Sequence, residues 1–252
     1  MQLRNDPAEG AILRLRAWGP GTDRVFEQAP KLLGSEDDRS TFKPQHDIIA
    51  DAHRRNPGFR IGRTDRVLDA LVPAILGQKI QSKLANESLR KLSWYFGERA
   101  PGPHKLWLQP TPERLAELPF HDWHRINVER KRATIIRRAA ERANRIEECA
   151  SMTPTDAARR LQAFAGIGPW TTARTLMPAI GDADSVMVGD FHLKNTVSWA
   201  LAGEPRGTDE RMLELLEPYA GHRGRVTMLL KMAGVKAPAY GPRLSHMHFE
   251  DR

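Results

Sequence analysis

A glycine-rich turn between two helical patterns, within residues 161–194, constrains the fold of this chain more than any other feature. The segment reads LQAFAGIGPWTTARTLMPAIGDADSVMVGDFHLK. Apolar residues at helical spacing lead up to Gly166, which can adopt a positive φ and cap the first helix. Gly168 lets the chain reverse, and Pro169 can open the next helix because the N–H group that it lacks would have no partner there. The sequence therefore predicts a tight helix-hairpin-helix.

The turn of this hairpin is a candidate binding site for a phosphate group. The N–H groups of Gly166, Gly168 and the first residues of the second helix lack intrahelical acceptors, so we expect them to converge where an anion can bind. Such a contact positions a nucleic-acid backbone without reading its bases. We assign this role to Gly166, Ile167, Gly168 and Thr171. The alternative is a structural turn between packed helices, which a short glycine motif leaves open.

An isolated acidic residue, Asp190, follows Gly168 at a distance of 22 residues. It comes after the apolar run Val186–Val188 and Gly189 and precedes a helical pattern, so its spacing predicts a helix N-cap. The helix N-terminus and hydrogen bonds to a carboxylate both lower a carboxyl pKa, which would keep Asp190 ionised. Capping and catalysis are compatible roles, and spacing alone does not choose between them.

Two stretches of this sequence resemble motifs of a known family. LQAFAGIGPWTTA followed by VMVGDFHLK resembles the helix-hairpin-helix and Gly/Pro-Asp signature of the DNA base-excision glycosylase superfamily, and most of all its DNA-3-methyladenine glycosylase II branch. LVPAILGQKI, at residues 71–80, resembles the LVxxILxQQ helix of the family. The resemblance covers roughly residues 45–235. It implies a mainly α fold of two helical lobes around a cleft, with Gln78 from one lobe and the hairpin with catalytic Asp190 from the other.

The resemblance also implies a reaction. A DNA glycosylase takes a damaged base out of the double helix and hydrolyses its N-glycosidic bond. Sugar hydrolases usually need two carboxylates, one of which protonates the leaving group. A base alkylated at a ring nitrogen is already cationic, so one carboxylate suffices. Asp190 would then stabilise positive charge on the deoxyribose and orient or deprotonate the attacking water.

Trp170 occupies the position at which the glycosylase/lyase branch has a lysine that forms a Schiff base with the sugar. Tryptophan cannot form that bond, so we expect a monofunctional enzyme that leaves an uncleaved abasic site. Trp170 is also a candidate wall of the base pocket, since an electron-poor base prefers an aromatic face. The alternative is a core aromatic residue that packs under the hairpin.

Tyr219 and His222 are further candidates for the base pocket. His222 aligns where well-known relatives have a stacking tryptophan, and histidine can also stack on a base. Gln78 is a candidate for filling the gap left by the base or touching the opposite strand, and an exposed helix-end glutamine is the alternative. The remaining aromatic candidates are expected mainly in the core: Phe120, Trp123 and Trp199.

The charge of the chain suits a polyanionic partner. It has 39 basic and 31 acidic residues and a formal net charge of +8. Many of the arginines lie between Arg125 and Arg145, where an ordinary solvated helix face is the alternative to a DNA contact. We expect the partner to be double-stranded DNA that contains damaged bases.

Two other functions stay open at this point. A non-catalytic helix-hairpin-helix DNA-binding protein would use the hairpin, but Asp190 would then weaken binding by repelling phosphates. A glycosylase for deaminated or mismatched bases would release a neutral base, which requires additional acid catalysis that the sequence does not reveal.

Cysteine and histidine usage restricts the cofactors. Cys149 is the single cysteine, so the four-cysteine iron–sulfur cluster of one branch of the family is excluded and a reducing compartment is indicated. The nine histidines form no pattern typical of a metal site. We expect no cofactor, and only a monovalent cation at the hairpin backbone is left open. Without an 18-residue apolar run or a signal peptide, we expect a cytoplasmic protein that binds no membrane. The resemblance implies a monomer, and DNA binding would associate this bacterial protein with the nucleoid.

We expect three parts: an N-terminal segment (residues 1–44), the two-lobed helix-hairpin-helix glycosylase domain (45–235) and a C-terminal tail (236–252). Ile12–Trp18 alternates apolar and charged residues, which predicts a short strand, a β remnant packed against the helical body. Pro73 is expected to kink or split the first helix of the domain. The expected helices lie near residues 66–77, 80–96, 112–118, 131–147, 154–165, 169–180, 190–202, 209–218 and 223–234.

Overall fold

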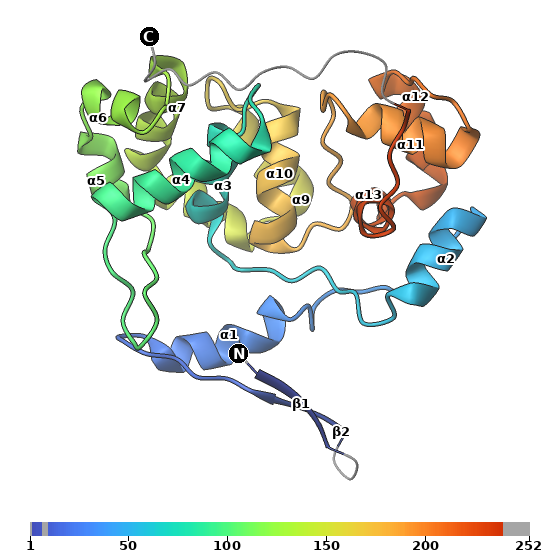
Figure 1. Ribbon diagram of the computed structural model, residues 1–252, viewed down its shortest axis with the longest axis horizontal. Coiled ribbons are helices and arrows are strands. Elements are labelled where there is room, and N and C mark those ends of the chain that lie inside the picture. Colours follow the sequence, from blue (N-terminus) through green and yellow to red (C-terminus); the bar gives the residue numbers. More distant parts are fainter. Residues whose placement is uncertain (1, 7–9, 239–252) are drawn as a thin grey trace.

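Helices dominate the computed structural model, which describes residues 2–6 and 10–238 (Figure 1). The α-helices are α1 (Thr22–Leu32), α2 (Asp47–Arg55), α3 (Val67–Leu76), α4 (Ser82–Phe96), α5 (Pro112–Glu117), α6 (Phe120–Arg125), α7 (Arg130–Ala140), α8 (Ala143–Glu147), α9 (Pro154–Gln162), α10 (Pro169–Ile180), α11 (Leu193–Ala202), α12 (Asp209–Leu216) and α13 (Arg223–Met232). Two short 3-10 helices are η1 (Glu148–Ser151) and η2 (Glu217–Tyr219). The mainly α fold class is confirmed. None of the described helices combines the length and apolar character that spanning a membrane requires.

Two separate apolar cores divide the helices into two lobes, as predicted. The core of the first lobe lies among α3 to α10 and includes the fully buried Leu71, Ile75 and Ile136. The core of the second lobe lies among α2, α11, α12 and α13 and includes Ile49 and Val197. Figure 1 shows the two groups side by side, with α10 on the side of the first lobe that is nearer the second.

The segment before α3 contributes to both lobes rather than forming a unit of its own. In Figure 1, α1 lies below the first lobe, and the chain then continues to α2 beside the second lobe before it returns to α3. α2 packs against α13. Phe42, which the sequence analysis assigned to the N-terminal segment, lies in the core of the second lobe. The N- and C-terminal parts of the chain therefore build this lobe together.

A buried ion pair attaches this segment to the second lobe. Arg225 of α13 donates from Nη1 to Oδ2 of Asp37 at 3.0 Å, and its Nη2 contacts Oδ1 of the same carboxylate. The two side chains are 1% and 2% exposed. The guanidinium also lies 5.8 Å from the ring centroid of Phe42. A charge at this depth is tolerated only with its partner in place.

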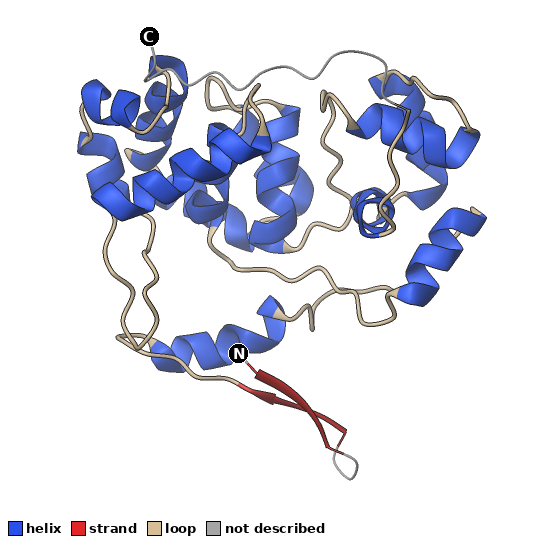
Figure 2. Cartoon of the chain, viewed as in Figure 1, coloured by secondary structure: helices blue, strands red, loops and turns tan. Residues whose placement is uncertain are grey.

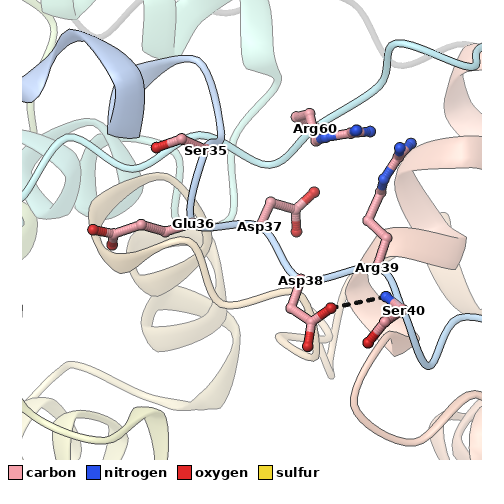
Figure 3. A pocket seen from close by; sticks show the side chains of 7 residues that line it. All are labelled: Ser35, Glu36, Asp37, Asp38, Arg39, Ser40 and Arg60. Atoms are coloured by element: carbon pink, nitrogen blue, oxygen red, sulfur yellow. Dashed lines mark hydrogen bonds between the residues drawn. The ribbon is translucent and has the colours of Figure 1, made fainter.

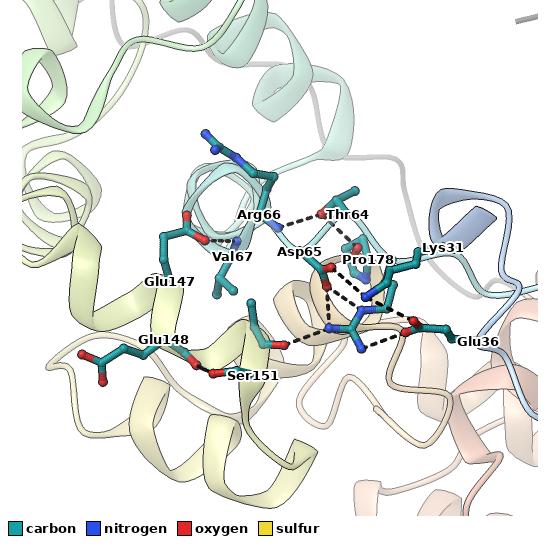
Figure 4. A network of polar contacts seen from close by, with 12 residues as sticks. Lys31, Glu36, Thr64, Asp65, Arg66, Val67, Glu147, Glu148, Ser151 and Pro178 are labelled. Carbon is teal, nitrogen blue, oxygen red and sulfur yellow. Dashed lines mark hydrogen bonds and ion pairs between the residues drawn. The ribbon is translucent and has the colours of Figure 1, made fainter. Parts of the chain in front are cut away.

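A second set of polar contacts attaches the same segment to the first lobe (Figure 4). Arg63 donates to Asp65 at 2.5 Å and to the carbonyl oxygen of Ala150, in η1, at 2.8 Å. Lys31 Nζ lies 3.1 Å from Glu36, and Glu36 also receives a hydrogen bond from Arg63 at 3.3 Å. These groups are partly exposed, so each ion pair contributes little free energy and the network serves mainly to set position.

Pro73 lies inside α3 without splitting it, contrary to one of the predicted outcomes. Proline cannot donate to the carbonyl oxygen four residues earlier, that of Asp69. In the structure, the side-chain amide of Gln109 donates to this oxygen at 2.9 Å. At the start of α3, the Glu147 carboxylate accepts from the first two N–H groups of the helix at 2.9 and 3.0 Å. Side chains from outside α3 thus provide hydrogen-bond partners both for the carbonyl oxygen that Pro73 leaves free and for the first two N–H groups of the helix.

The strand prediction was partly wrong. The chain forms a two-stranded antiparallel hairpin of β1 (Gln2–Asp6) and β2 (Gly10–Arg14), coloured red in Figure 2, rather than one strand at Ile12–Trp18. The ladder ends at the pair of Gln2 and Arg14, so residues 15–18 have no partner strand in the described chain. Figure 1 shows the hairpin extending away from the lobes, so the expected packing of this strand against the helical body is also wrong.

Some helix boundaries also differ from the prediction. The expected helix at 131–147 is divided into α7 and α8, because Arg142 has φ −122° and ψ 30° and interrupts the helix. α9 ends at Gln162 instead of residue 165. The helices α1, α2 and α6 were not predicted. The predicted tail from residue 236 lies outside the described residues beyond position 238.

Replacing Asp37 with asparagine tests the buried ion pair. The change leaves the Arg225 guanidinium buried without a counter-charge, so we expect the free energy of unfolding to fall by about 3–5 kcal/mol. Urea denaturation followed by circular dichroism measures this. The matched control is Glu36→Gln, which alters a more exposed neighbour and should change stability by less than about 1 kcal/mol. Equal effects of the two substitutions would contradict the assignment.

Candidate functional site

The predicted helix-hairpin-helix is present and consists of α9, a turn and α10. Gly166 has φ +93°, and a Cβ at this position would lie 2.5 Å from Cδ1 of Ile135, so both backbone and space require glycine there. Pro169 is the first residue of α10. Gly168 differs, because its φ is −99° and a Cβ would meet nothing within 4 Å. The protein itself therefore does not require glycine at position 168, whereas an approaching ligand backbone would.

The donors of the turn are arranged in part as predicted. Among the described residues, the N–H groups of Gly166 and Gly168 have no hydrogen-bond acceptor. Ile167 is different, because its N–H donates to the carbonyl oxygen of Phe164 at 3.0 Å and its side chain is buried. Thr171 is buried as well. The N–H groups of Trp170 and Thr171, in the first turn of α10, likewise have no acceptor among the described residues. The open donors therefore come from the two glycines and the start of α10, whereas Ile167 supports the turn from within.

Gln78 lies against the hairpin. Its side-chain amide donates to the carbonyl oxygen of Gly166 and to Oγ1 of Thr171, both at 2.9 Å. The predicted contact with DNA at the lesion remains a prediction, and so does the alternative of an exposed helix-end glutamine; the Gln78 side chain is partly exposed and hydrogen-bonded to the hairpin. The division of the site between lobes also needs correction. Ile167 belongs to the same core as α3, so Gln78 and the hairpin share the first lobe and only Asp190 belongs to the second.

Asp190 stands just before α11 and uses both carboxylate oxygens. Oδ1 accepts from the N–H groups of His192 and Leu193 at 2.9 and 3.0 Å, which is the capping contact predicted from the sequence. The regular helix begins at Leu193 rather than at residue 190. Oδ2 accepts from Nε1 of Trp170 at 2.9 Å. This second hydrogen bond connects the two lobes at the hairpin.

The surroundings of Asp190 favour its charged form. Burial raises the carboxyl pKa, but the hydrogen bonds from Trp170 and from the N–H groups of His192 and Leu193 outweigh it. The net result is a pKa below the ordinary value of an aspartate. Asp190 is therefore a carboxylate at neutral pH, able to stabilise a developing positive charge or to hold a water molecule.

Trp170 is held from three directions. Its indole N–H donates to Asp190 at its edge. At the far end of the ring, Cη2 of Trp170 packs close to Gly77. A Cβ added at position 77 would lie only 3.3 Å from this atom, so glycine there leaves room for the indole. Cζ of Arg174 lies 5.3 Å from the ring centroid, a cation–π contact. The ring is only partly buried, so it is a structural link that still reaches the surface of the site.

Tyr219 and His222, predicted as pocket residues, are buried in contacts with the N-terminal segment. Tyr219 is 2% exposed, and its hydroxyl lies 2.6 Å from Nδ1 of His46. His222 is 6% exposed and lies 2.8 Å from Oγ1 of Thr41. Burial lowers the pKa of His222, and Arg225 lowers it further. Both side chains are thus buried and hydrogen-bonded within the protein, and the structure does not present either ring to a base.

The arginine-rich stretch is less solvated than a plain helix face. Arg132 of α7 is 1% exposed and donates to the carbonyl oxygen at the end of α3, that of Leu76, at 2.8 Å. Arg130 and Arg137 lie 4.6 and 5.0 Å from the ring centroid of Phe120. Several of these cations therefore have structural roles, and the stretch as a whole is not a free basic surface.

A pocket elsewhere on the molecule contains none of the predicted site residues. It lies along the segment after α1 and is lined by Ser35, Glu36, Asp37, Asp38, Arg39, Ser40 and Arg60 (Figure 3). Asp37 is committed to Arg225, and Asp38 accepts from the N–H of Ser40 at 2.8 Å. In the part of the chain that the structure describes, no group of three or more His, Cys, Asp or Glu side chains is placed to hold a metal ion. The candidate site is therefore the hairpin with Asp190.

Comparison with known proteins gives this arrangement a family. Residues 72–220 match the family described as HhH-GPD superfamily base excision DNA repair protein. The chain belongs to this superfamily. The match includes Gln78, the hairpin and Asp190, so the site lies within the region that defines the family.

Two curated relatives are similar to this chain. YfjP of Bacillus subtilis (strain 168), provisionally named a DNA-3-methyladenine glycosylase, is 25% identical over 163 residues, or 62% of this chain and 56% of YfjP. A DNA-3-methyladenine glycosylase of the same organism is 25% identical over 182 residues, or 70% of this chain and 60% of the relative. The chain thus spans less than two thirds of the length of these relatives.

Solved structures share the fold at low sequence identity. The 3-methyladenine DNA glycosylase from Archaeoglobus fulgidus superposes with a TM-score of 0.75 at 19% identity, over 92% of this chain and 81% of that protein. An 8-oxoguanine glycosylase/lyase from Clostridium acetobutylicum, in complex with double-stranded DNA, gives 0.71 at 15% identity, over 92% and 80%. One fold therefore accommodates glycosylases with different named substrates.

Arg174 is a residue of this site that the sequence analysis did not single out. It follows Trp170 by four residues on α10, a spacing that places two side chains on the same face of a helix. That spacing was available in the sequence. Its significance was not, because the face of α10 on which Trp170 lies is decided by packing between lobes.

Alanine should reduce stability at Gly166 and DNA affinity at Gly168. Gly166→Ala introduces strain at a positive φ and a clash with Ile135, so we expect a loss of about 1–3 kcal/mol in the free energy of unfolding. Gly168→Ala should change stability by no more than about 0.5 kcal/mol but weaken binding to duplex DNA, because the methyl group occupies the space that a phosphate would enter. Thermal unfolding and fluorescence anisotropy measure the two effects. Unchanged DNA affinity in Gly168→Ala would contradict the assigned role.

Proposed function

We propose that this protein is a monofunctional DNA glycosylase that hydrolyses the N-glycosidic bond of a damaged base in double-stranded DNA. The observation that carries the proposal is the hydrogen bond between Trp170 and Asp190. It attaches an ionised carboxylate to a hairpin whose free N–H groups can bind a phosphate. A backbone anchor and a carboxylate are thereby held together at the junction of the lobes. Membership of the HhH-GPD superfamily supports the same function.

The chemistry requires little more than these groups. The target nucleotide must leave the helix stack, and the C1′–N bond must break as positive charge grows on the deoxyribose. The Asp190 carboxylate stabilises this charge and orients or deprotonates the attacking water. A base that is cationic through alkylation departs as a neutral molecule and needs no acid. We therefore propose alkylated bases of the 3-methyladenine type as substrates, a class supported by the names of the Bacillus and Archaeoglobus relatives.

Absence of strand cleavage follows from Trp170. The lyase reaction needs an amine that attacks the sugar, and an indole has no such nucleophile. The indole N–H is in addition engaged by Asp190. We propose that the product is an intact abasic site and that the protein acts as a monomer without a cofactor, apart from a monovalent cation that the hairpin backbone could hold.

A DNA-binding protein without catalysis is the alternative. It would need the hairpin, but a partly buried carboxylate with a lowered pKa beside the anchor would repel the DNA backbone. Asp190 also contributes two capping hydrogen bonds, which asparagine or serine could supply without the charge. The charge itself therefore favours catalysis.

Asp190→Asn tests the proposal. The substitution keeps the size of the side chain and an oxygen for capping but removes the charge. We expect the single-turnover rate of 7-methylguanine release from methylated duplex DNA to fall by about 100-fold or more. Wild-type DNA products should be cleaved only after alkali treatment. The matched control is Asp156→Asn, a carboxylate in the first turn of α9, which should keep full activity. Base release by Asp190→Asn at the wild-type rate would exclude the proposed mechanism.

Trp170→Phe tests the link between the indole and the carboxylate. Loss of the N–H donor removes a hydrogen bond that lowers the Asp190 pKa, so this pKa should rise. Activity requires the carboxylate, hence the acidic limb of the pH–rate profile should move to higher pH. Single-turnover rates across the acidic range, corrected for spontaneous base loss, measure the shift. Trp94→Phe, on the exposed surface of α4, is the control. A profile that keeps its shape and loses only amplitude would argue against this coupling.

A further inference from the structure

A cluster of exposed aromatic rings lies at the end of α4. Trp94 and Tyr95, in the last turn of this helix, are 58% and 47% exposed, and Trp107, in the segment that follows it, is 38% exposed. The ring centroids of Trp94 and Trp107 lie 5.0 Å apart. We call these three residues the aromatic patch. Large aromatic side chains are mostly covered in folded proteins, so three together on the surface indicate a binding surface.

The backbone holds the aromatic patch in place. The segment 97–108 leaves α4 and returns along itself, with Arg99 and Trp107 opposite each other in an antiparallel bridge. Gly97 lets the returning chain approach the end of α4, because a Cβ there would clash with the carbonyl oxygen of Leu108. Figure 1 shows the segment descending from α4 to the start of α1. The rings are thus presented by a fixed framework.

Cations without carboxylate partners stand beside these rings. Arg90 precedes Trp94 by four residues on α4, a spacing that places both side chains on one face of the helix. Arg99 and Trp107 lie between the hydrogen bonds that flank their bridge, and the side chains of such a pair are close neighbours on one face. Arg90 and Arg99 are exposed, and neither forms an ion pair with any residue that the structure describes.

The other face of the segment after α4 differs in chemistry. Side chains alternate between the two faces of paired strands, so Leu106 and Leu108 lie on the face opposite Trp107. Glu98 precedes Arg99 and lies on that opposite face as well. The face that carries the aromatic patch is therefore both aromatic and cationic.

This combination is complementary to single-stranded nucleic acid. The bases of a single strand expose flat faces that stack on aromatic rings, and its phosphates attract cations. In duplex DNA these faces are already stacked on one another, so a duplex offers little to the rings. A second copy of this protein, with its net charge of +8, would bring the same cations to the patch and be repelled.

We propose that the aromatic patch binds single-stranded DNA at a site separate from the hairpin. α4 begins at Ser82, four residues after Gln78, which contacts the hairpin. The rise of an α-helix places Trp94 about 18 Å further along its axis. The inference goes beyond the proposed function and does not depend on it. One molecule can thus hold a single strand at the patch while its hairpin holds a duplex.

Binding of a fluorescein-labelled oligothymidylate of about 20 nucleotides, measured by fluorescence anisotropy, tests the aromatic patch. The protein is first saturated with an unlabelled duplex that contains an abasic-site analogue, so that the hairpin is occupied. We expect Trp94→Ala and Trp107→Ala each to weaken oligothymidylate binding by at least about 5-fold. Trp94→Phe keeps a ring and should retain most of the affinity. Trp199→Ala, on the exposed surface of α11, is the matched control.

A variant and a competitor separate stacking from charge. Arg99→Gln keeps all the rings and should weaken binding while reducing its dependence on salt. Polyglutamate carries negative charge but no bases, so it should displace oligothymidylate poorly. Displacement at the same charge concentration as unlabelled oligothymidylate would favour an acidic polypeptide as the partner and overturn the inference.

The remaining outcomes keep the inference distinct from the proposed function. Absence of oligothymidylate binding to the saturated wild type would overturn the inference, as would unchanged binding by both alanine variants. Failure of the wild type to release a damaged base, with oligothymidylate binding intact, would count against the proposed function alone. Unfolding temperatures show whether each variant is folded.

Discussion

The hydrogen bond from Trp170 to Asp190 is the contact on which the rest of the site depends. It joins the first helix turn after the hairpin to the residue that caps α11, and these belong to different lobes. One carboxylate thus serves two purposes, because Oδ1 caps a helix while Oδ2 fixes the indole. The same contacts favour the ionised form of Asp190.

This contact requires that the two lobes keep their relative position, and the segment before α3 contributes to holding it. Asp37 pairs with Arg225 in the second lobe, while Arg63 reaches Ala150 in the first. The pair at Asp37 is buried and demands its partner, whereas the contacts of Arg63 are partly exposed and individually weak. The segment therefore acts as a strap across both lobes. Its residues His46 and Thr41 also contact Tyr219 and His222, which explains why these two side chains are buried.

Charges of opposite sign surround one indole ring. The carboxylate of Asp190 meets the edge of Trp170, where the N–H carries partial positive charge, and Arg174 lies over the face, which is electron-rich. Each group is placed according to the polarity of the ring. The fold is shared with glycosylases of different named substrates, so the fold alone does not determine specificity.

The amino-acid sequence by itself determined the local features of this protein. The glycine turn at Gly166, the start of α10 at Pro169 and the capping by Asp190 all depend on residues within a few positions of one another, so spacing and backbone geometry sufficed. Only the tertiary structure decided which partners meet across the chain. Asp190 meets Trp170 over 20 residues, and His222 meets Thr41 over 181. Such contacts depend on how the apolar faces of the lobes pack, which no short-range pattern encodes.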